Sequence, residues 1–362
     1  MKNSINKKLL ERMAESLVQV HPAFDRKKFV ALAPRLEALE LKARVQLVRD
    51  QLHQQLPGDY KKALGILLKS LKSESLRGFD LWPYTEFVQT YGLDQPELSL
   101  LALREMTVLF TSEFAVRPFL REHGKFTLAF LLKCSSHPNP HVRRWASEGT
   151  RPRLPWGERL QEFVRDPAPA LPLLEKLKYD EELYVRKSVA NHLNDIAKDH
   201  PETVLGLLKR WGAAVPPAHE EKIRWITRHA LRTLIKSGHP EALALMGARS
   251  DIRIQARALA LKRASLRMNE VMEFAFEVES LAKKPQTLIV DYVIHHQKAG
   301  QKTTAKVFKL KTLTLAPGER RFIQKRHPLK PITTRKYYSG DHLLEIQING
   351  KIYLRTKWVL KV

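Results

Sequence analysis

Several features that identify common classes of protein are missing from this sequence of 362 residues. It holds one cysteine, Cys134, so the chain cannot build a disulfide framework. The N-terminal stretch MKNSINKKLLERMAESL has no apolar run of signal-peptide length, and no segment approaches the ~20 uncharged apolar residues of a membrane span. These absences favour a protein of the cytoplasm with no membrane partner.

Signatures of cofactor and metal binding are also missing. The sequence has no Gly-rich phosphate loop and no dinucleotide fingerprint. His137 and His141 are four residues apart, but Pro138 and Pro140 prevent a regular helical ligand pair, and no Cys or carboxylate cluster completes a site. We therefore expect neither a metal nor a cofactor.

Acidic residues are scarce. The 38 Asp and Glu residues stand against 63 Lys and Arg residues, which gives a formal net charge of +25. Such an excess usually indicates a polyanionic partner, most often nucleic acid. A basic protein of a membrane surface would concentrate its charge in one amphipathic helix or a polybasic tail, whereas here the charge is spread along the chain. The composition favours a nucleic-acid partner and a location at the nucleoid.

The pattern of apolar residues changes near residue 268. Before it, apolar residues recur at helical spacing, as in LSLLALREMTVLF (98–110). After it, five alternating runs rich in β-branched and aromatic residues are separated by turn signals, and Asn349-Gly350 is a strong hairpin signal. We predict a helical domain over residues 1–266 and a small antiparallel β-sandwich of immunoglobulin type over residues 268–362. The latter has 18 basic and 8 acidic residues.

The helical part contains a weak repeat. HVRRWASEG begins at residue 141, YVRKSVANHL at 184 and KIRWITRHALRTL at 222, so the Val-Arg or Ile-Arg pairs fall at 142, 185 and 223. This spacing is the length of a HEAT-type pair of helices. Stacked repeats would align the recurring basic residues on one concave surface. For a single repeat a solvated helix face is the simpler explanation, but the recurrence favours the basic surface.

The segment HPNPHVRRWASEGTRPRLPWG (137–157) predicts a short helix followed by a stiff loop. Asn139 is the expected N-cap, Pro140 the first helical residue and Gly149 a left-handed C-terminal residue. The prolines of TRPRLPW prevent a helix and hold a loop that presents Trp156. Trp145 lies within the short helix and is expected in the core.

This segment resembles the signature of the AlkC-type DNA alkylation-repair glycosylases, in the HEAT-like repeat superfamily that also contains AlkD. TSEFAVRPFL (111–120) is similar to the preceding repeat of that family, and YVRKSVANHLNDIAKDHP (184–201) to the following one. The three segments span residues 111–201. One branch of the family carries a C-terminal immunoglobulin-like domain, which agrees with the predicted order of domains.

The resemblance implies a monofunctional, monomeric glycosylase of base excision repair that needs no cofactor. Its substrate would be duplex DNA with bases methylated on a ring nitrogen, chiefly 3-methyladenine and 3-methylcytosine. A cationic base leaves without a strong general acid, and positive charge develops on the deoxyribose. A carboxylate beside the sugar stabilises that charge and positions water.

Three acids fit this role. Glu113, Glu148 and Asp195 lie in the three family-like segments. On spacing alone each is structural: Glu113 would pair with Arg117, and Glu148 with Arg144. The resemblance implies that Glu113 and Asp195 are catalytic, and that Glu148 orients Arg144 or lies close to the lesion.

Trp156 has two interpretations, because core packing is the usual fate of Trp. The resemblance favours contact with the deoxyribose or the cationic base. Basic residues in both predicted domains are candidates for contact with DNA phosphates. They are Arg143, Arg144, Arg151, Arg153, Arg186, Lys187, Arg224, Arg228, Arg320 and Arg321.

Two other functions are compatible with parts of the sequence. A non-enzymatic HEAT-repeat protein that binds DNA or RNA would share the basic surface, and its acids would serve structure alone. A protein-binding scaffold would place apolar patches, not arginines, on the concave face. Only a glycosylase requires Glu113 and Asp195 near each other, facing the same groove as Trp156.

Salt should weaken DNA binding steeply, because each phosphate that the protein neutralises releases counterions. We expect the logarithm of the binding constant to fall linearly with the logarithm of the salt concentration. Fluorescence anisotropy of labelled duplex DNA at several salt concentrations measures this slope. An affinity that does not change between low and moderate salt would contradict a phosphate-dominated interface.

Overall fold

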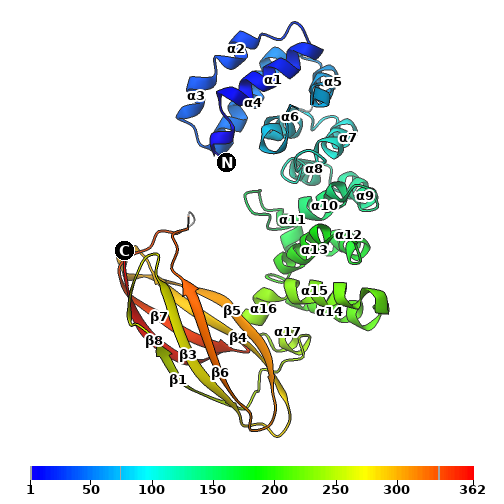
Figure 1. Ribbon diagram of the computed structural model, residues 1–362. Helices are drawn as coiled ribbons and strands as arrows, with labels where there is room; N and C mark the ends of the chain where they lie inside the picture. Colours follow the sequence, from blue (N-terminus) through cyan, green and yellow to red (C-terminus); the bar gives the residue numbers. More distant parts are fainter. Residues whose placement is uncertain (1, 74, 333–334) are drawn as a thin grey trace. The chain divides into compact units, whose positions relative to one another are not determined.

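The computed structural model describes residues 2–73, 75–332 and 335–362. Helices occupy the chain from residue 7 to residue 244, and strands follow from residue 254 (Figure 1). The helices are α1 (Lys7–Val20), α2 (Arg26–Val30), α3 (Ala33–Glu37), α4 (Leu41–Gln55), α5 (Tyr60–Ser70), α6 (Trp82–Tyr91), α7 (Pro96–Met106), α8 (Arg117–Glu122), α9 (Gly124–Cys134), α10 (Pro140–Gly149), α11 (Gln161–Arg165), α12 (Leu171–Leu177), α13 (Leu183–Ile196), α14 (Pro201–Ala213), α15 (Glu220–Ala230), α16 (Arg232–Lys236) and α17 (Pro240–Ala244).

For the helix predicted within residues 137–157, the N-terminal end is correct and the C-terminal end is not. The Asn139 side chain accepts a hydrogen bond from the His141 amide at 2.8 Å, and Pro140 is the first residue of α10. Gly149 is the last helical residue and does not have a left-handed conformation. Glycine is needed there for space, because a Cβ atom would lie 2.6 Å from Val116 Cγ1.

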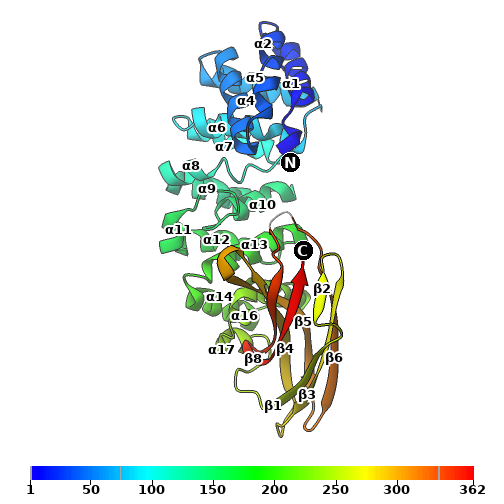
Figure 2. The same ribbon diagram turned by 90° about the vertical axis from the view of Figure 1, so that its left-hand side faces the viewer.

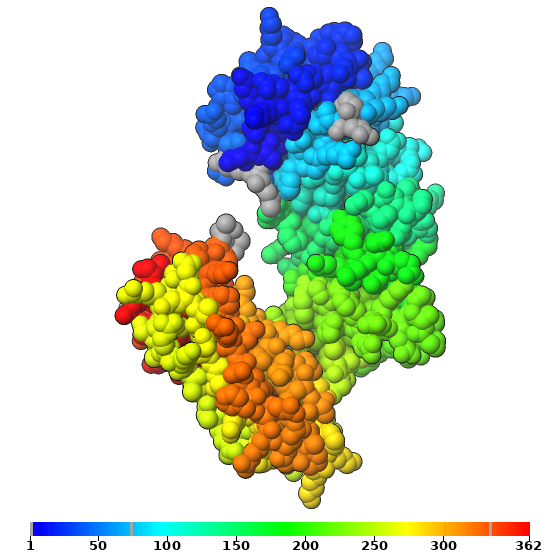
Figure 3. All heavy atoms as spheres, viewed as in Figure 1, coloured from blue at the N-terminus to red at the C-terminus, as the bar shows by residue number. Residues whose placement is uncertain are grey.

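The repeat predicted from the sequence corresponds to successive helices. The Val-Arg and Ile-Arg pairs lie near the N-termini of α10, α13 and α15, and Val142, Val185 and Ile223 are all buried. A continuous apolar core runs from Ile5 to Leu173. In Figure 2 the helices of this region follow one another in chain order, and in Figure 3 the atoms of the same region run from blue to green. The helical repeat architecture is confirmed. No helix in the described ranges is long and apolar enough to cross a membrane.

Eight strands form two sheets in the C-terminal part of the described chain. The strands are β1 (Ile254–Leu261), β2 (Ser265–Arg267), β3 (Val271–Ser280), β4 (Gln286–Gln297), β5 (Thr303–Leu315), β6 (Arg320–Pro328), β7 (Gly340–Ile348) and β8 (Lys351–Lys361). One sheet has the order β1-β3-β6 and the other the order β2-β8-β7-β4-β5. The five predicted runs correspond to β3, β4, β5, β7 and β8.

A shared apolar core joins the two sheets. Phe276 and Ile323 from the first sheet cluster with Ile294, Ile346 and Trp358 from the second. Buried and half-buried residues alternate along β3, which explains why its sequence pattern predicted a strand. The described pairs are antiparallel except for β2 with β8, which run parallel. The predicted β-sandwich is confirmed, with this one parallel pair added.

The predicted boundary between residues 266 and 268 needs correction. It falls in β2, and the first strand already begins at Ile254. The run IQARALAL was missed because Ala, Leu and Arg favour helices; its strand conformation comes from pairing with β3, across a bulge between Arg257 and Ala260. The chain divides into two compact units, residues 1–200 with 215–229, and residues 201–214 with 230–362. The second unit therefore contains α14, α16 and α17 as well as the strands.

The Asn-Gly hairpin predicts a stability effect. Asn349 and Gly350 have φ values of 44° and 81° between the paired residues Ile348 and Lys351, as a two-residue turn requires. A Cβ atom on Gly350 would lie 2.0 Å from the Gly238 Cα atom. Gly350→Ala should therefore lower the free energy of unfolding by about 1–2 kcal/mol for backbone strain and about 1–3 kcal/mol for the clash.

Gly318→Ala is the matched control, because Gly318 has a φ of 73° and a Cβ atom there would meet nothing within 4 Å. It should cost the strain alone. Thermal and urea denaturation of both variants measure the difference. Equal losses in the two variants would show that the contact with Gly238 contributes nothing.

Candidate active site

The three acids predicted from the sequence come from different elements. Glu113 lies in the loop before α8, Glu148 near the end of α10 and Asp195 near the end of α13. Helices α10 and α13 pack directly against each other: the Ser188 hydroxyl donates to Ser147 Oγ at 3.0 Å. This packing brings the ends of the two helices, and with them two of the acids, to one place.

Two arginines link the three acids into one chain of ion pairs. Arg144 Nη1 lies 2.7 Å from Glu113 Oε2, and Arg144 Nη2 lies 3.6 Å from Glu148 Oε1. Arg151 Nη1 donates to Glu148 Oε1 at 2.6 Å, and its Nε and Nη2 reach Asp195 Oδ2 at 2.8 Å. We call Glu113, Arg144, Glu148, Arg151 and Asp195 the carboxylate–arginine chain.

The carboxylate–arginine chain is largely withdrawn from water. The exposed fractions are 8% for Glu113, 5% for Glu148 and 2% for Asp195. Burial works to lower the pKa of Arg144, but the Glu148 and Glu113 carboxylates outweigh it and the pKa lies above its ordinary value. Three carboxylates face two guanidiniums and the ammonium group of the exposed Lys198, which lies 3.1 Å from Asp195, so their formal charges balance. Carboxylate oxygens are thus held in fixed positions within a strongly basic protein.

The three acids differ in the oxygen atoms that they leave free. Both oxygens of Glu148 are engaged, Oε1 by the arginines and Oε2 by the Ser188 hydroxyl at 2.6 Å. Both oxygens of Asp195 are engaged as well, by Arg151 and Lys198. Glu113 Oε2 accepts from Arg144 and from Thr111 Oγ1 at 2.7 Å, while its Oε1 accepts no hydrogen bond from a described residue. Glu113 alone of the three presents an unengaged oxygen.

The local partner proposed for Glu113 from the sequence is wrong. Arg117 does not pair with Glu113; it binds main-chain carbonyls of the loop 149–158. The neighbouring Ser112 donates its hydroxyl to the Leu103 carbonyl at 2.8 Å, and α8 starts at Arg117. The partner of Glu113 is Arg144, 31 residues along the sequence, a pairing that local spacing cannot reveal.

The two tryptophans lie where the sequence placed them. Trp145 is fully buried in the core, and Trp156 is 55% exposed on the loop between α10 and α11. Trp156 has a φ of 67°, a left-handed conformation that is uncommon for a residue with a Cβ atom. The loop therefore presents the indole outward in a conformation that other groups must maintain.

Two of the three recurring arginines of the repeat, Arg143 and Arg186, have structural partners. Arg143 donates to the carbonyls of His137 and Pro138, six and five residues earlier. Arg186 does the same with the carbonyls six and five residues before it, at Asp180 and Glu181. Arg143 also pairs with the Asp180 carboxylate at 2.6 Å. The recurrence predicted as a phosphate-binding pattern thus closes the loops between helices.

The predicted phosphate ligands fall into two groups. Arg143, Arg144, Arg151 and Arg153 are paired with carboxylates, Arg153 with Asp199 at 2.7 Å. Binding a phosphate would compete with these ion pairs.

The other group is more accessible. Lys187, Arg224 and Arg228 are exposed and form no ion pair with a described residue. Arg320 and Arg321 on β6 are exposed and pair with Glu279 and Glu319. The charged groups of these five side chains are therefore more accessible to a phosphate than those of the first group.

Two residues beside the carboxylate–arginine chain were not identified from the sequence. His192 is fully buried on α13 and donates from Nδ1 to the Ser147 carbonyl at 3.0 Å. Burial, reinforced by Arg151, lowers its pKa to about 3, so the ring is neutral and adds no charge. Ser188, which donates a hydrogen bond to Glu148, could not be identified from the sequence either, because Ser and His residues within a helix have no distinctive spacing.

No metal centre accompanies this site in the part of the chain that the structure describes: no group of three or more His, Cys, Asp and Glu side chains there is arranged to hold an ion. His137, one of the pair considered from the sequence, binds the Asn139 amide through Nδ1 at 3.1 Å.

Comparisons with known proteins extend over the whole chain. Residues 255–362 match a family described as the C-terminal Ig-like domain of the uncharacterised protein YhaZ. The chain is 39% identical over 355 residues to YhaZ of Bacillus subtilis strain 168, which covers 97% of both proteins. A solved structure of the Pseudomonas fluorescens alkylpurine DNA glycosylase AlkC, bound to DNA containing an abasic site analog, matches with a TM-score of 0.91 and 39% identity, over 100% of this chain and 99% of that one.

Arg151→Met should destabilise the protein by about 3–5 kcal/mol, because Glu148 and Asp195 would both lose a buried partner. Arg153→Met is the matched control. It removes the same group from a partly exposed pair with Asp199 and should cost at most about 1 kcal/mol. Urea denaturation followed by far-ultraviolet circular dichroism measures both. Similar losses would show that burial of the chain is not what makes Arg151 important.

Proposed function

We propose that this chain, which belongs to the family of AlkC and YhaZ, is a DNA glycosylase that hydrolyses the N-glycosidic bond of cationic, N-methylated bases. The observation that carries the proposal is Glu113 Oε1, an unengaged carboxylate oxygen at the end of a buried carboxylate–arginine chain. The AlkC relative is an alkylpurine DNA glycosylase, which supports this class of substrate. We include 3-methyladenine and 3-methylcytosine, whose rings are cationic.

The chemistry needs little from a general acid. As the bond from C1′ to the base nitrogen breaks, its electron pair goes to the base, which leaves as a neutral molecule. Positive charge then develops on the deoxyribose, and a fixed negative charge nearby stabilises that state. Water adds to C1′ and loses a proton, for which Glu113 Oε1 is the proposed acceptor. The reaction requires no metal and no cofactor.

The other two acids act in this proposal through their charge and their contacts. Both oxygens of Asp195 and of Glu148 are already bound by cations or by Ser188. They keep Arg151 and Arg144 in place and balance the charge of these cations. Glu148 thus has the orienting role expected from the sequence, and Asp195 a longer-range electrostatic role.

Trp156 supplies the aromatic contact in the proposal. Its indole is exposed, and the loop that carries it begins next to Arg151, a member of the carboxylate–arginine chain. An aromatic face attracts positive charge, so it would stack against the cationic base or the oxocarbenium-like sugar. The exposed Lys187, Arg224 and Arg228 are the proposed phosphate ligands of the helical unit.

Glu113→Gln should slow base release by roughly 10²- to 10³-fold with little loss of DNA affinity, because it removes charge and keeps shape. Asp195→Asn should slow release by a smaller factor, since both Asp195 oxygens are already held by cations. Single-turnover release of 3-methyladenine from methylated duplex DNA measures the rates. Binding to duplex DNA with an abasic site analog measures affinity.

Asp199→Asn is the matched control for charge loss. Asp199 pairs with Arg153 outside the carboxylate–arginine chain, so this variant should keep a near-wild-type rate. Wild-type rates in both Glu113→Gln and Asp195→Asn would contradict the proposed site and favour a protein that binds nucleic acid without catalysis.

A further inference from the structure

The loop that carries Trp156 is held by hydrogen bonds to its main chain. It connects α10 to α11 over residues 150–160 and contains no regular helix or strand. Trp156 has a left-handed backbone, which a side chain with a Cβ atom rarely adopts on its own. Inside the loop, the Gly157 amide donates to the Leu154 carbonyl at 3.2 Å and closes a turn around Pro155 and Trp156. Two cationic side chains add support from outside the loop.

Arg117 ties the two ends of the loop together. It is 1% exposed, and its guanidinium donates to the carbonyls of Gly149 at 3.0 Å, Arg151 at 2.9 Å and Glu158 at 2.9 Å. Burial lowers its pKa to about 10, although the Glu158, Asp195 and Glu113 carboxylates act in the opposite direction. The hydrogen bonds of this buried guanidinium go to main-chain carbonyls, whereas buried charges are normally paired directly with an opposite charge. Its contacts fix the separation of the start and end of the loop.

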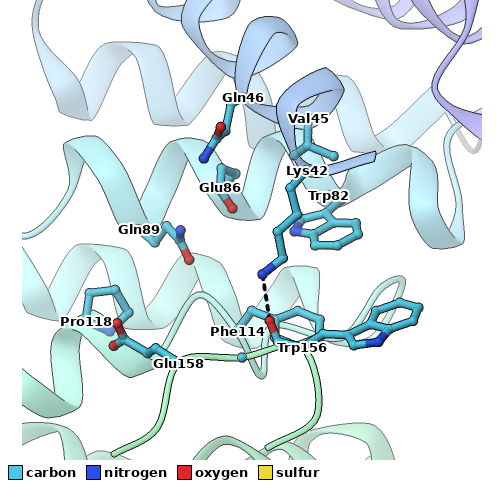
Figure 4. A pocket seen from close by; sticks show the side chains of 11 residues that line it. Lys42, Val45, Gln46, Trp82, Glu86, Gln89, Phe114, Pro118, Trp156 and Glu158 are labelled. Atoms are coloured by element: carbon cyan, nitrogen blue, oxygen red, sulfur yellow. Dashed lines mark hydrogen bonds between the residues drawn. The ribbon is translucent and has the colours of Figure 1, made fainter. Parts of the chain in front are cut away.

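Lys42 supports the loop at its tip. It projects from α4, 114 residues away in sequence, and its ammonium group donates to the Trp156 carbonyl at 2.7 Å. Figure 4 shows Lys42 reaching across to that carbonyl, with Trp82 on one side and Glu86 and Gln89 on the other. The carbonyl that it holds belongs to the residue with the left-handed backbone.

Packing does not hold this part of the loop. A cavity of about 240 Å³ lies beside it, lined by Lys42, Glu86, Phe114 and Trp156 among others. Trp82 and Phe114 stack on each other with ring centroids 5.6 Å apart and form an aromatic wall. Because a cavity replaces van der Waals partners on this side, the tip is restrained by hydrogen bonds: the Lys42 contact from outside, and the bond from the Gly157 amide to the Leu154 carbonyl within the loop.

We infer that Lys42 and Arg117 are positioning residues: they hold Trp156 in the conformation that places its indole against the lesion. The inference rests on the proposed function of Trp156. It gives the N-terminal helices a part in the active site, since α4 lies far from every family-like segment of the sequence. Neither residue touches the reacting atoms; each acts through the loop.

Lys42 is the better residue to test, because it is exposed and its loss should not unfold the protein. Lys42→Met keeps the aliphatic stem and removes the donor, whereas Lys42→Arg restores a donor. Lys61→Met is the matched control, an exposed lysine on α5 that makes no ion pair with a described residue. It reports the effect of losing one positive charge on DNA binding.

The first readout needs neither DNA nor catalysis. Of the six tryptophans, Trp156 is the most exposed, with Trp82, Trp145, Trp211 and Trp358 at or below 4%. Acrylamide quenching and time-resolved anisotropy, each taken as the difference from the same protein carrying Trp156→Phe, therefore isolate Trp156. Lys42→Met should increase its fast local motion and change its quenching. Lys42→Arg and Lys61→Met should leave both as in the wild type.

The second readout is single-turnover base release. Lys42→Met should lower the rate between about 3-fold and 10²-fold, because a small displacement of a positioning group is costly. Lys42→Arg should recover most of the rate, and Lys61→Met should affect DNA affinity alone. In a Trp156→Ala background, Lys42→Met should have no further effect on the rate, since the two residues act through one contact.

The outcomes separate the two proposals. Unchanged Trp156 dynamics in Lys42→Met would overturn the positioning role, as would rate losses that add independently to those of Trp156→Ala. Altered Trp156 dynamics in a protein that releases no base in any variant would leave the positioning role intact and contradict the glycosylase instead.

Discussion

The burial of three carboxylates with two arginines is the constraint on which the rest of the helical unit depends. Replacing such buried charges by well-packed apolar residues is often neutral or stabilising, so stability alone does not explain them. Each partner is instead costly to lose, and Glu148 is shared by both arginines. Helices α10 and α13 must therefore meet closely enough for Ser188 and His192 to bind groups on α10. In the proposed function, a cationic ligand gives this arrangement its purpose.

The internal ion pairs of the arginines also change how the net positive charge of the protein is interpreted. Arginines were expected to bind phosphates, yet Arg143 and Arg186 close the loops before their own helices. Arg144 and Arg151 neutralise acids. A net charge of +25 therefore includes many groups with internal partners. In the proposed function, DNA is attracted by the remaining cations, carried by exposed side chains, and by the long-range field of the whole charge.

Much of the fold could be predicted from the sequence, since most strands alternate clearly and Asn349-Gly350 specifies a hairpin. The missed strands lack that signal: β1 is rich in Ala and Leu, and β6 is an edge strand with exposed basic residues. The three segments that carry the site residues were recognisable by their resemblance to the AlkC-type family. The ion pairs and hydrogen bonds between those segments were not. Arg117 binds carbonyls 32 to 41 residues away, and no residue type in its neighbourhood indicates that contact.

Sequence reasoning treated Glu113 and Asp195 as equals, and hydrogen bonding distinguishes them. Both oxygens of Asp195 are engaged, so Asp195 contributes its negative charge but has no oxygen free to accept a further hydrogen bond. Glu113 provides both a negative charge and a free oxygen. For Glu113 Oε1 to remain free, the cations that bind phosphates must lie elsewhere, because a nearby cation would form an ion pair with it. The exposed Lys187, Arg224 and Arg228 satisfy this condition, because none of them pairs with a described acid. In the proposed function, separation of the two kinds of cation thus allows the protein to attract a polyanion and still keep a free carboxylate oxygen for a cationic base.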